Sequence, residues 1–306
     1  MTPPAPPRVS GGRAQGESRS FRKLRPLHPR FGVELIEAQA CALDAEAVEQ
    51  VRALLAQHGA ILFRGQQLTD EAHEAFSRRI GTGALELSAR RISHGRATPY
   101  VSQLTNLADG RGRALGFGGN GTDFWHSDQE FRERPATLAT LYCRIPAPVG
   151  GETSFASTVV ANLGLSPDLL DRIRPLWSTR MPAQSHDNVD RIEVAHPLVL
   201  RTPCGDRELL YHSENTRRFL GVGEREATML RATLLDAILA PANLYSHRWQ
   251  AGDLLLYDNT QLVHRREAFS GERWLQGTKI FGPPDRFAQP AGMRCGLSEE
   301  AILATA

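Results

Sequence analysis

The sequence predicts a mixed but mainly β fold, a jelly roll (double-stranded β-helix) with flanking helices. From Tyr100 onward, short strand candidates are separated by turns rich in Gly and Pro, which is typical of antiparallel jelly rolls. Helical spacing of apolar residues is confined to a few segments, and 306 residues suit one large domain. We therefore expect one jelly-roll domain over 23–306, preceded by a disordered leader over 1–22.

The first elements after the leader are predicted to be a helix, a strand and a second helix. Asp44 is a candidate N-cap for a helix that ends at Gly59. The apolar run 60–63 predicts a short buried strand. Thr69 can cap the second helix, which Gly81 stops.

Strand candidates at 100–104 and 137–142 then open the β region. Ser166-Pro167 predicts the N-cap and first position of a further helix. A last helix is predicted over 225–239, and we expect both to buttress or interrupt the β core. The apolar residues at helical spacing in this last helix are Met229, Leu230, Leu234 and Ile238.

Charge and cysteine usage argue against several classes of protein. The 36 Lys and Arg against 34 Asp and Glu give a formal charge of +2 without a long cationic run, so no nucleic acid partner is expected. The four cysteines are scattered without a CxxC pair, which favours reduced thiols over a zinc cluster or disulfides. No apolar run suits a membrane span or signal peptide, so we expect a cytoplasmic protein without a membrane partner. The oligomeric state stays open, a homo-oligomer included.

The most informative motif is His126-Ser127-Asp128, taken together with His264. Two imidazoles and one carboxylate on one face of Fe(II) leave the opposite face for a co-substrate and O2. In an extended segment His126 and Asp128 project from the same face. A His-x-Asp tripeptide alone is weak evidence for a metal site, since most such histidines are ordinary packed or surface residues. The Gly-Asp turn and apolar strand over 252–259 strengthen it, because such a strand delivers the distal His264 to a barrel interior.

Two further residues suit an acidic co-substrate. The planar fork of an arginine such as Arg273 binds a carboxylate through two parallel hydrogen bonds, although most arginines lie on the surface. The turn at Gly150-Gly151 presents Thr153, whose hydroxyl can join Arg273 on the same carboxylate. By itself that stretch predicts only a turn.

These motifs, in this order, resemble the Fe(II)/2-oxoglutarate-dependent taurine/2,4-dichlorophenoxyacetate dioxygenase (TauD/TfdA-like) family over nearly everything after the leader. The resemblance implies a clavaminate synthase-like jelly roll in which His126, Asp128 and His264 hold iron. It also implies that Thr153 and Arg273 bind the distal carboxylate of 2-oxoglutarate. The other segments that carry it include Ile61-Leu62-Phe63-Arg64-Gly65, Leu68-Thr69-Asp70-Glu71, Gly150-Gly151-Glu152-Thr153, His196-Pro197 and Leu210-Tyr211.

The activity implied is oxidation of a C–H bond of a small organic substrate, usually hydroxylation, with O2 and decarboxylation of 2-oxoglutarate to succinate and CO2. Asp128 disfavours halogenation, because related halogenases carry a small residue there. Gly277 stands where taurine-type members carry a second arginine, which puts a sulfonate or simple aryloxyacetate substrate in doubt. The alternatives are desaturation or cyclisation of an amino acid derivative on the same site, or a non-redox metal-binding jelly-roll protein.

Other polar and aromatic residues near these motifs are predicted to be structural. Trp125 is expected to pack in the barrel more than to line a substrate site. Segment 180–191 is either an active-site lid or, as we favour, a solvated loop. His196, His212 and His247 are predicted not to be metal ligands.

Overall fold

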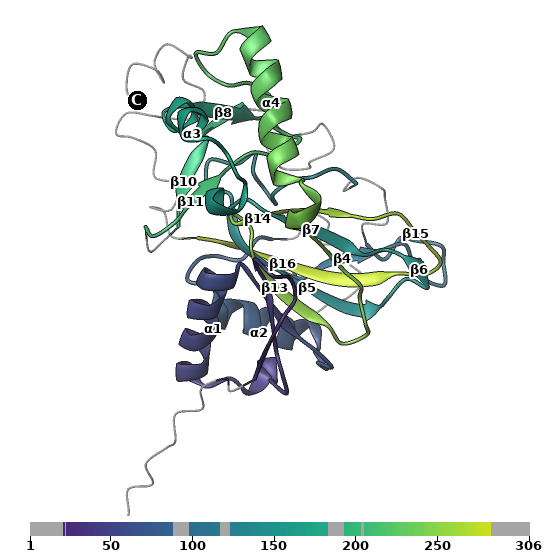
Figure 1. Ribbon diagram of the computed structural model, residues 1–306. Helices are drawn as coiled ribbons and strands as arrows, with labels where there is room; N and C mark the ends of the chain where they lie inside the picture. The colour runs from purple at the N-terminus through teal and green to yellow at the C-terminus, as the bar shows by residue number, and fades with distance from the viewer. Residues whose placement is uncertain are drawn as a thin grey trace, which may run out of the picture.

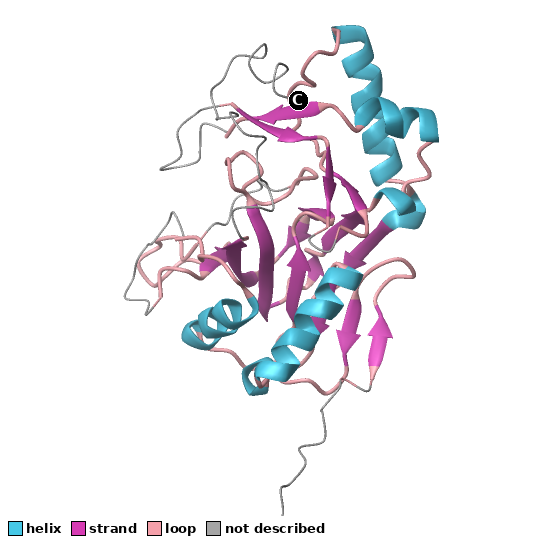
Figure 2. Ribbon diagram, turned by 90° about the vertical axis from the view of Figure 1, so that its left-hand side faces the viewer, coloured by secondary structure: helices cyan, strands magenta, loops and turns pink. Residues whose placement is uncertain are grey.

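The computed structural model describes residues 21, 23–87, 98–116, 123–182, 193–202 and 205–282. The predicted leader lies outside them apart from residue 21. The described part is mainly β: strands fill the middle of the molecule, and the helices gather below and above them (Figure 2). None of its helices is long and apolar enough to cross a membrane.

The larger sheet has seven strands in the order β1-β2-β3-β13-β5-β16-β4. All its neighbours are antiparallel except β2 and β3. The strand predicted at 100–104 begins two residues later, and the one predicted at 137–142 is longer at both ends. The bounds are β1 Leu24–Pro26, β2 Val33–Leu35, β3 Ala60–Phe63, β4 Ser102–Thr105, β5 Ala136–Ile145, β13 Leu254–Asp258 and β16 Trp274–Phe281.

A second sheet of three strands, in the order β12-β7-β14, faces the first across an apolar layer. Its bounds are β7 Thr153–Ser157, β12 Leu244–His247 and β14 Leu262–Arg266. The layer joins Leu255 and Tyr257 of β13 with Phe155 of β7 and the first residue of β14. Short ladders complete the strands: β6 Val149–Gly150 with β15 Phe269–Ser270, β8 Trp177–Arg180 with β9 Val194–Pro197, and β10 Val199–Arg201 with β11 Glu208–Leu210.

Helices α1 (Ala45–His58) and α2 (Asp70–Ile80) pack against the outer face of the seven-stranded sheet (Figure 1). The predicted caps are confirmed, because the side chains of Asp44 and Thr69 accept hydrogen bonds from backbone N–H groups in the first turns. Gly59 ends α1 in the left-handed conformation at φ 73°, and Gly81 caps α2.

Helices α3 (Pro167–Ile173) and α4 (Glu224–Ile238) pack in one apolar cluster with residues of the three-stranded sheet. Ser166 caps α3 as predicted. In α4 the predicted apolar stripe is correct for three residues and wrong for Met229, which is 59 % exposed. Met229 falls off the stripe because it precedes Leu230 by one residue, a turn of about 100° around the helix. Three 3-10 turns complete the described part of the chain, at Ala40–Ala42, Val160–Asn162 and Pro241–Asn243.

Candidate functional site

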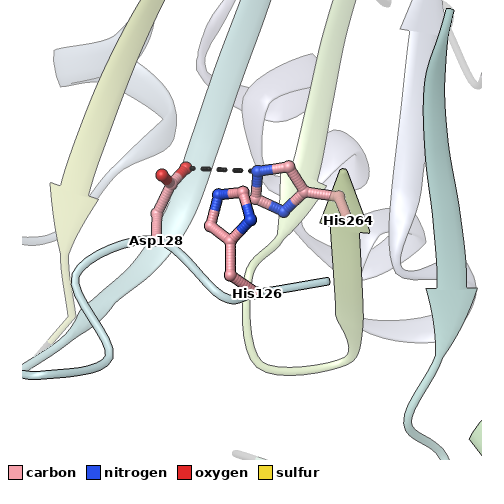
Figure 3. Close-up of side chains that lie close together, drawn as sticks. All are labelled: His126, Asp128 and His264. Atoms are coloured by element: carbon pink, nitrogen blue, oxygen red, sulfur yellow. Dashed lines mark ion pairs between the residues drawn. The ribbon is translucent and has the colours of Figure 1, made fainter. Parts of the chain in front are cut away.

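His126 and Asp128 lie in the segment that precedes β5, next to the edge of β14. His126 and His264 exchange both backbone hydrogen bonds, with N···O distances of 3.0 and 2.9 Å, so their imidazole centroids lie 4.4 Å apart. One ligand atom from each of His126, Asp128 and His264 lies within 4.8 Å of the others. The two rings and the carboxylate converge from two separate segments (Figure 3). The structure thus brings together all three predicted metal ligands.

Asn259, which directly follows β13, fixes the backbone of Asp128. Its Oδ1 accepts a hydrogen bond from the Asp128 N–H at 2.8 Å, and its Nδ2 donates to the Asp128 carbonyl at 2.9 Å. The same Nδ2 donates to the carbonyl of Ala136 at 2.7 Å. A buried amide with these bonds holds the ligand-bearing turn against the large sheet.

The carboxylate of Asp128 is held by two side chains of the large sheet. The Tyr257 hydroxyl donates to Oδ2 at 2.9 Å, and the Lys279 ammonium lies 3.6 Å from Oδ1. Burial alone would raise the pKa of Asp128, but the nearby Lys279, His264 and His126 together hold it well below its usual value. Asp128 is therefore ionised, which is the form that binds a metal ion.

The two histidines present imidazole nitrogens to the same space. His126 Nδ1 lies 2.9 Å from the carbonyl of Phe124, a contact that makes Nδ1 the donor and leaves Nε2 as the acceptor nitrogen. His264 Nε2 lies 3.8 Å from Asp128 Oδ2, while its buried Nδ1 has no hydrogen-bond partner among the described residues. Burial and the charge of His126 lower the pKa of His264 to about 3, so this ring is neutral. Two imidazoles with one ionised carboxylate form a donor set that fits a divalent metal ion.

The two residues predicted to bind an acidic co-substrate lie at the other end of β14. Thr153 pairs with Arg266 across the β7–β14 ladder, and its Oγ1 accepts a hydrogen bond from Trp249 Nε1 at 3.1 Å. Arg273 is 5 % exposed, and its Nε donates to the carbonyl of Gly151 at 3.2 Å. Thr153 and Arg273 are thus tied to the same short stretch of chain.

Arg273 lies in a cationic, largely desolvated corner. Its guanidinium carbon is 5.5 Å from the centroid of the Phe269 ring, and that of Arg266 is 5.2 Å from the same ring. Burial and the charge of Arg266 lower the pKa of Arg273 to about 10, so it stays protonated near neutral pH. Within the described residues no carboxylate pairs with Arg273, so this corner is suited to an incoming anion.

A buried polar network surrounds Glu130 in the turn 128–132, which is called the metal-ligand turn because it begins at Asp128. This network corrects one prediction. Arg180, which we expected in a solvated loop, ends β8 fully buried, with its Nε 3.0 Å from Glu130 Oε2. Ser213 and Asn215 also donate to the Glu130 carboxylate, at 2.7 and 2.8 Å. The loop prediction fails here because hydrogen bonds from Arg180, Ser213 and Asn215 satisfy the Glu130 charge, which burial would otherwise exclude. The rest of that segment, 183–191, lies outside the described residues.

Among the described residues, His196, His212 and His247 lie outside the group formed by His126, Asp128 and His264. His196 is buried, with its Nε2 3.1 Å from the carbonyl of Glu130, and His247 pairs with Asp253 at 3.1 Å. Trp125 packs in the cluster beneath α4. The sequence reasoning missed Lys279 and Glu86, which are near Asp128 only in the folded chain.

Known proteins are similar to this chain over most of its length. The profile of the taurine catabolism dioxygenase TauD, TfdA family matches residues 23–279. The chain is 30 % identical over 261 residues to an alpha-ketoglutarate-dependent 2,4-dichlorophenoxyacetate dioxygenase of Cupriavidus pinatubonensis, covering 78 % of this chain and 90 % of that one. It is 27 % identical to a pentalenolactone F synthase of Streptomyces arenae, covering 79 % and 89 %. A crystal structure of a putative alpha-ketoglutarate-dependent taurine dioxygenase from Burkholderia xenovorans superposes with a TM-score of 0.73 at 25 % identity, covering 85 % and 93 %.

Proposed function

This chain belongs to the taurine catabolism dioxygenase TauD, TfdA family, and on that premise we propose that His126, Asp128 and His264 hold a ferrous ion. As a family member the protein is an alpha-ketoglutarate-dependent dioxygenase, an oxidoreductase that requires 2-oxoglutarate and a metal ion. The observation that carries the ligand assignment is the convergence of the three side chains within 4.8 Å from two distant segments. Two imidazoles and one carboxylate suit iron, with O2 as oxidant, better than they suit magnesium or calcium, which prefer ligand sets made only of oxygen atoms.

Thr153 and Arg273 are proposed to bind the distal carboxylate of 2-oxoglutarate. The buried, protonated Arg273 without a carboxylate partner among the described residues supports this role, as does the proximity of Thr153 to Gly151 in the chain. Bound iron would supply oxidation of a substrate C–H bond, coupled to decarboxylation of 2-oxoglutarate to succinate and CO2. The protein orients the co-substrate through Arg273, keeps Asp128 ionised, and excludes water with the apolar layer between the sheets.

The fold proposed for this chemistry is a clavaminate synthase-like jelly roll, formed as a single domain over 23–306. Two sheets that face each other across one apolar layer, with the metal ligands at its edge, support it. A cytoplasmic location and the absence of nucleic acid and membrane partners stay predictions from the sequence.

The substrate is proposed to be a small organic molecule without an acidic group at the position where taurine-type members place a second arginine. A side chain at Gly277 would lie near the carbonyl of Thr140, at 3.2 Å, and near carbons of Leu141 and Leu104, at 3.4 and 3.6 Å. These neighbours are mostly apolar, and Gly277 itself brings no cation. Hydroxylation is the proposed outcome, and desaturation or cyclisation is the alternative; a product heavier by one oxygen or lighter by two hydrogens distinguishes them.

The ligand assignment is tested by anaerobic titration with Fe(II) and 2-oxoglutarate, following the weak visible charge-transfer band of a keto acid chelated to ferrous iron. We expect the band in the wild type and in His58→Ala, a control at the end of α1, and its loss in His126→Ala and Asp128→Ala. Succinate formation should disappear with it. Full turnover in either ligand variant would refute the assignment.

The co-substrate assignment is tested with Arg273→Ala. Loss of a charge-assisted partner weakens the binding of a buried carboxylate by roughly 2 to 5 kcal/mol. The 2-oxoglutarate concentration needed for half-maximal turnover should therefore rise at least about thirtyfold. Arg265→Ala is the matched control, because Arg265 pairs with Glu267 at 2.9 Å. An unchanged requirement in Arg273→Ala would remove Arg273 from this role.

A further inference from the structure

The chain uses arginine for almost every positive charge, yet it places a lysine at the metal site. It contains 34 Arg and two Lys, Lys23 and Lys279. Lys279 lies in β16, and its ammonium is 3.6 Å from Asp128 Oδ1 and 3.6 Å from Glu86 Oε2. A lysine ammonium is a compact point charge, whereas an arginine offers a planar fork. Composition alone therefore does not account for a lysine at this position.

The lysine belongs to a chain of alternating charges that begins and ends on the metal-ligand turn. Asp128 contacts Lys279, Lys279 contacts Glu86, and Glu86 Oε1 lies 3.6 Å from a guanidinium nitrogen of Arg132. The backbone N–H of Glu86 also donates to the carbonyl of Lys279 at 2.9 Å. Glu86 and Lys279 are thus fixed to each other and connected to both ends of the turn 128–132.

The two oxygens of Asp128 have different surroundings. Oδ2 faces His264 Nε2 at 3.8 Å, which is the side of the proposed metal, while Oδ1 faces Lys279. Because Lys279 lies between two carboxylates, it is not available to anchor an acidic substrate. Its remaining role is electrostatic and acts through Asp128.

We propose that Lys279 is a positioning residue that sets the metal affinity of the site, by holding Oδ1 of Asp128 and opposing the charge of the incoming cation, with Glu86 as its counter-charge. The proposal rests on the ligand assignment above. Lys279 compensates the negative charge of Asp128 in the metal-free protein, and its positive charge then repels the metal ion when that ion binds. Glu86 has the opposite effect, because it partly cancels the charge of Lys279.

This arrangement predicts opposite effects for the two neighbouring charges. Removing the ammonium leaves two carboxylates near the metal position, so the metal should bind more tightly. Removing the charge of Glu86 leaves Lys279 less compensated, so the metal should bind more weakly. A purely structural role for the pair would weaken metal binding in both variants, because each would loosen the same turn.

The experiment is titration of the full-length, metal-free protein with Mn(II) at fixed pH and ionic strength, with free Mn(II) followed by electron paramagnetic resonance. Lys279→Met should lower the dissociation constant about tenfold, Glu86→Gln should raise it about threefold or more, and Lys279→Arg should stay within about threefold of the wild type. The matched controls are Lys23→Met and Glu37→Gln, from an exposed pair at 3.7 Å, and both should leave it unchanged.

Unchanged or weaker binding by Lys279→Met, or unchanged or tighter binding by Glu86→Gln, would overturn the proposal. If Lys279→Met does not fold, Glu86→Gln and Lys279→Arg decide the question by the same criteria. Failure of the underlying assignment has a separate signature, because Asp128→Ala would then bind Mn(II) as well as the wild type does.

Discussion

Replacing Arg180 with Met tests whether the buried network beneath the metal-ligand turn is as costly to disrupt as its geometry indicates. Arg180 is fully buried and its Nε lies 3.0 Å from Glu130 Oε2. The variant would leave the Glu130 carboxylate buried without its cation, although Ser213 and Asn215 would still donate to it at 2.7 and 2.8 Å. Breaking a buried pair from one side costs about 3 to 5 kcal/mol, and the remaining donors place this case near about 3 kcal/mol.

The assay is urea unfolding of the metal-free protein at 25 °C, with the single variants Arg180→Met and Glu130→Gln and the double variant. We expect each single variant to lose about 3 kcal/mol of unfolding free energy, and the double variant to lose at least about 2 kcal/mol less than their sum. The exposed pair of Arg172 and Glu226, at 2.6 Å, is the matched control, and Arg172→Met should cost less than about 1 kcal/mol. Single losses below about 1 kcal/mol, or strict additivity, would refute the reasoning.

Three further predictions concern other parts of the site and the core. Asn259→Ala removes the bonds that hold Asp128, so it should cost about 2 to 4 kcal/mol in urea unfolding and weaken Mn(II) binding; unchanged binding would contradict this reading. Gly151→Ala, at φ 75° and with an added Cβ 3.2 Å from Arg273 Nε, should raise the 2-oxoglutarate requirement, and an unchanged requirement would count against it. Burial lowers the pKa of His73 to about 3, below the unfolded value of 6.5. The stability that the buried neutral imidazole contributes should therefore be lost as the pH falls below about 6.5, where the unfolded chain binds the proton first. That loss is about 2 kcal/mol at pH 5, and His73→Gln should flatten the pH dependence measured by urea unfolding.

Local rules were sufficient for the helices. Asp44, Thr69 and Ser166 each satisfy a backbone N–H of the first turn, and this chemistry is legible from a few adjacent residues. The one incorrect position in α4, Met229, shows the limit of this reasoning, because an apolar residue next to the stripe does not reveal which side is buried. The same limit applies to strand ends, which depend on partner strands elsewhere in the chain.

The candidate metal ligands were predictable because their chemistry is restricted to few residue types, although Asp128 lies in a turn and not in the extended segment that the spacing predicted. The groups that hold them were not. Lys279 and Glu86 are separated by almost two hundred residues in sequence and meet only through the pairing of 85–86 with β16. A polar segment such as 180–191 normally predicts a solvated loop, and only the burial of Arg180 beside Glu130 overturns that prediction.

The site depends on both sheets, which connects metal binding to the integrity of the fold. His126 and His264 belong to the side of the small sheet, where they pair through their backbones. Tyr257 and Lys279, which hold the Asp128 carboxylate, belong to β13 and β16 of the large sheet. A metal ion bound at this edge therefore contacts groups that only the packed sheets bring together, so it stabilises the packed state by mass action, by about 2.7 kcal/mol at a hundred times the dissociation constant. A lysine that weakens metal binding but compensates Asp128 in the metal-free protein would keep the sheets together before the ion arrives.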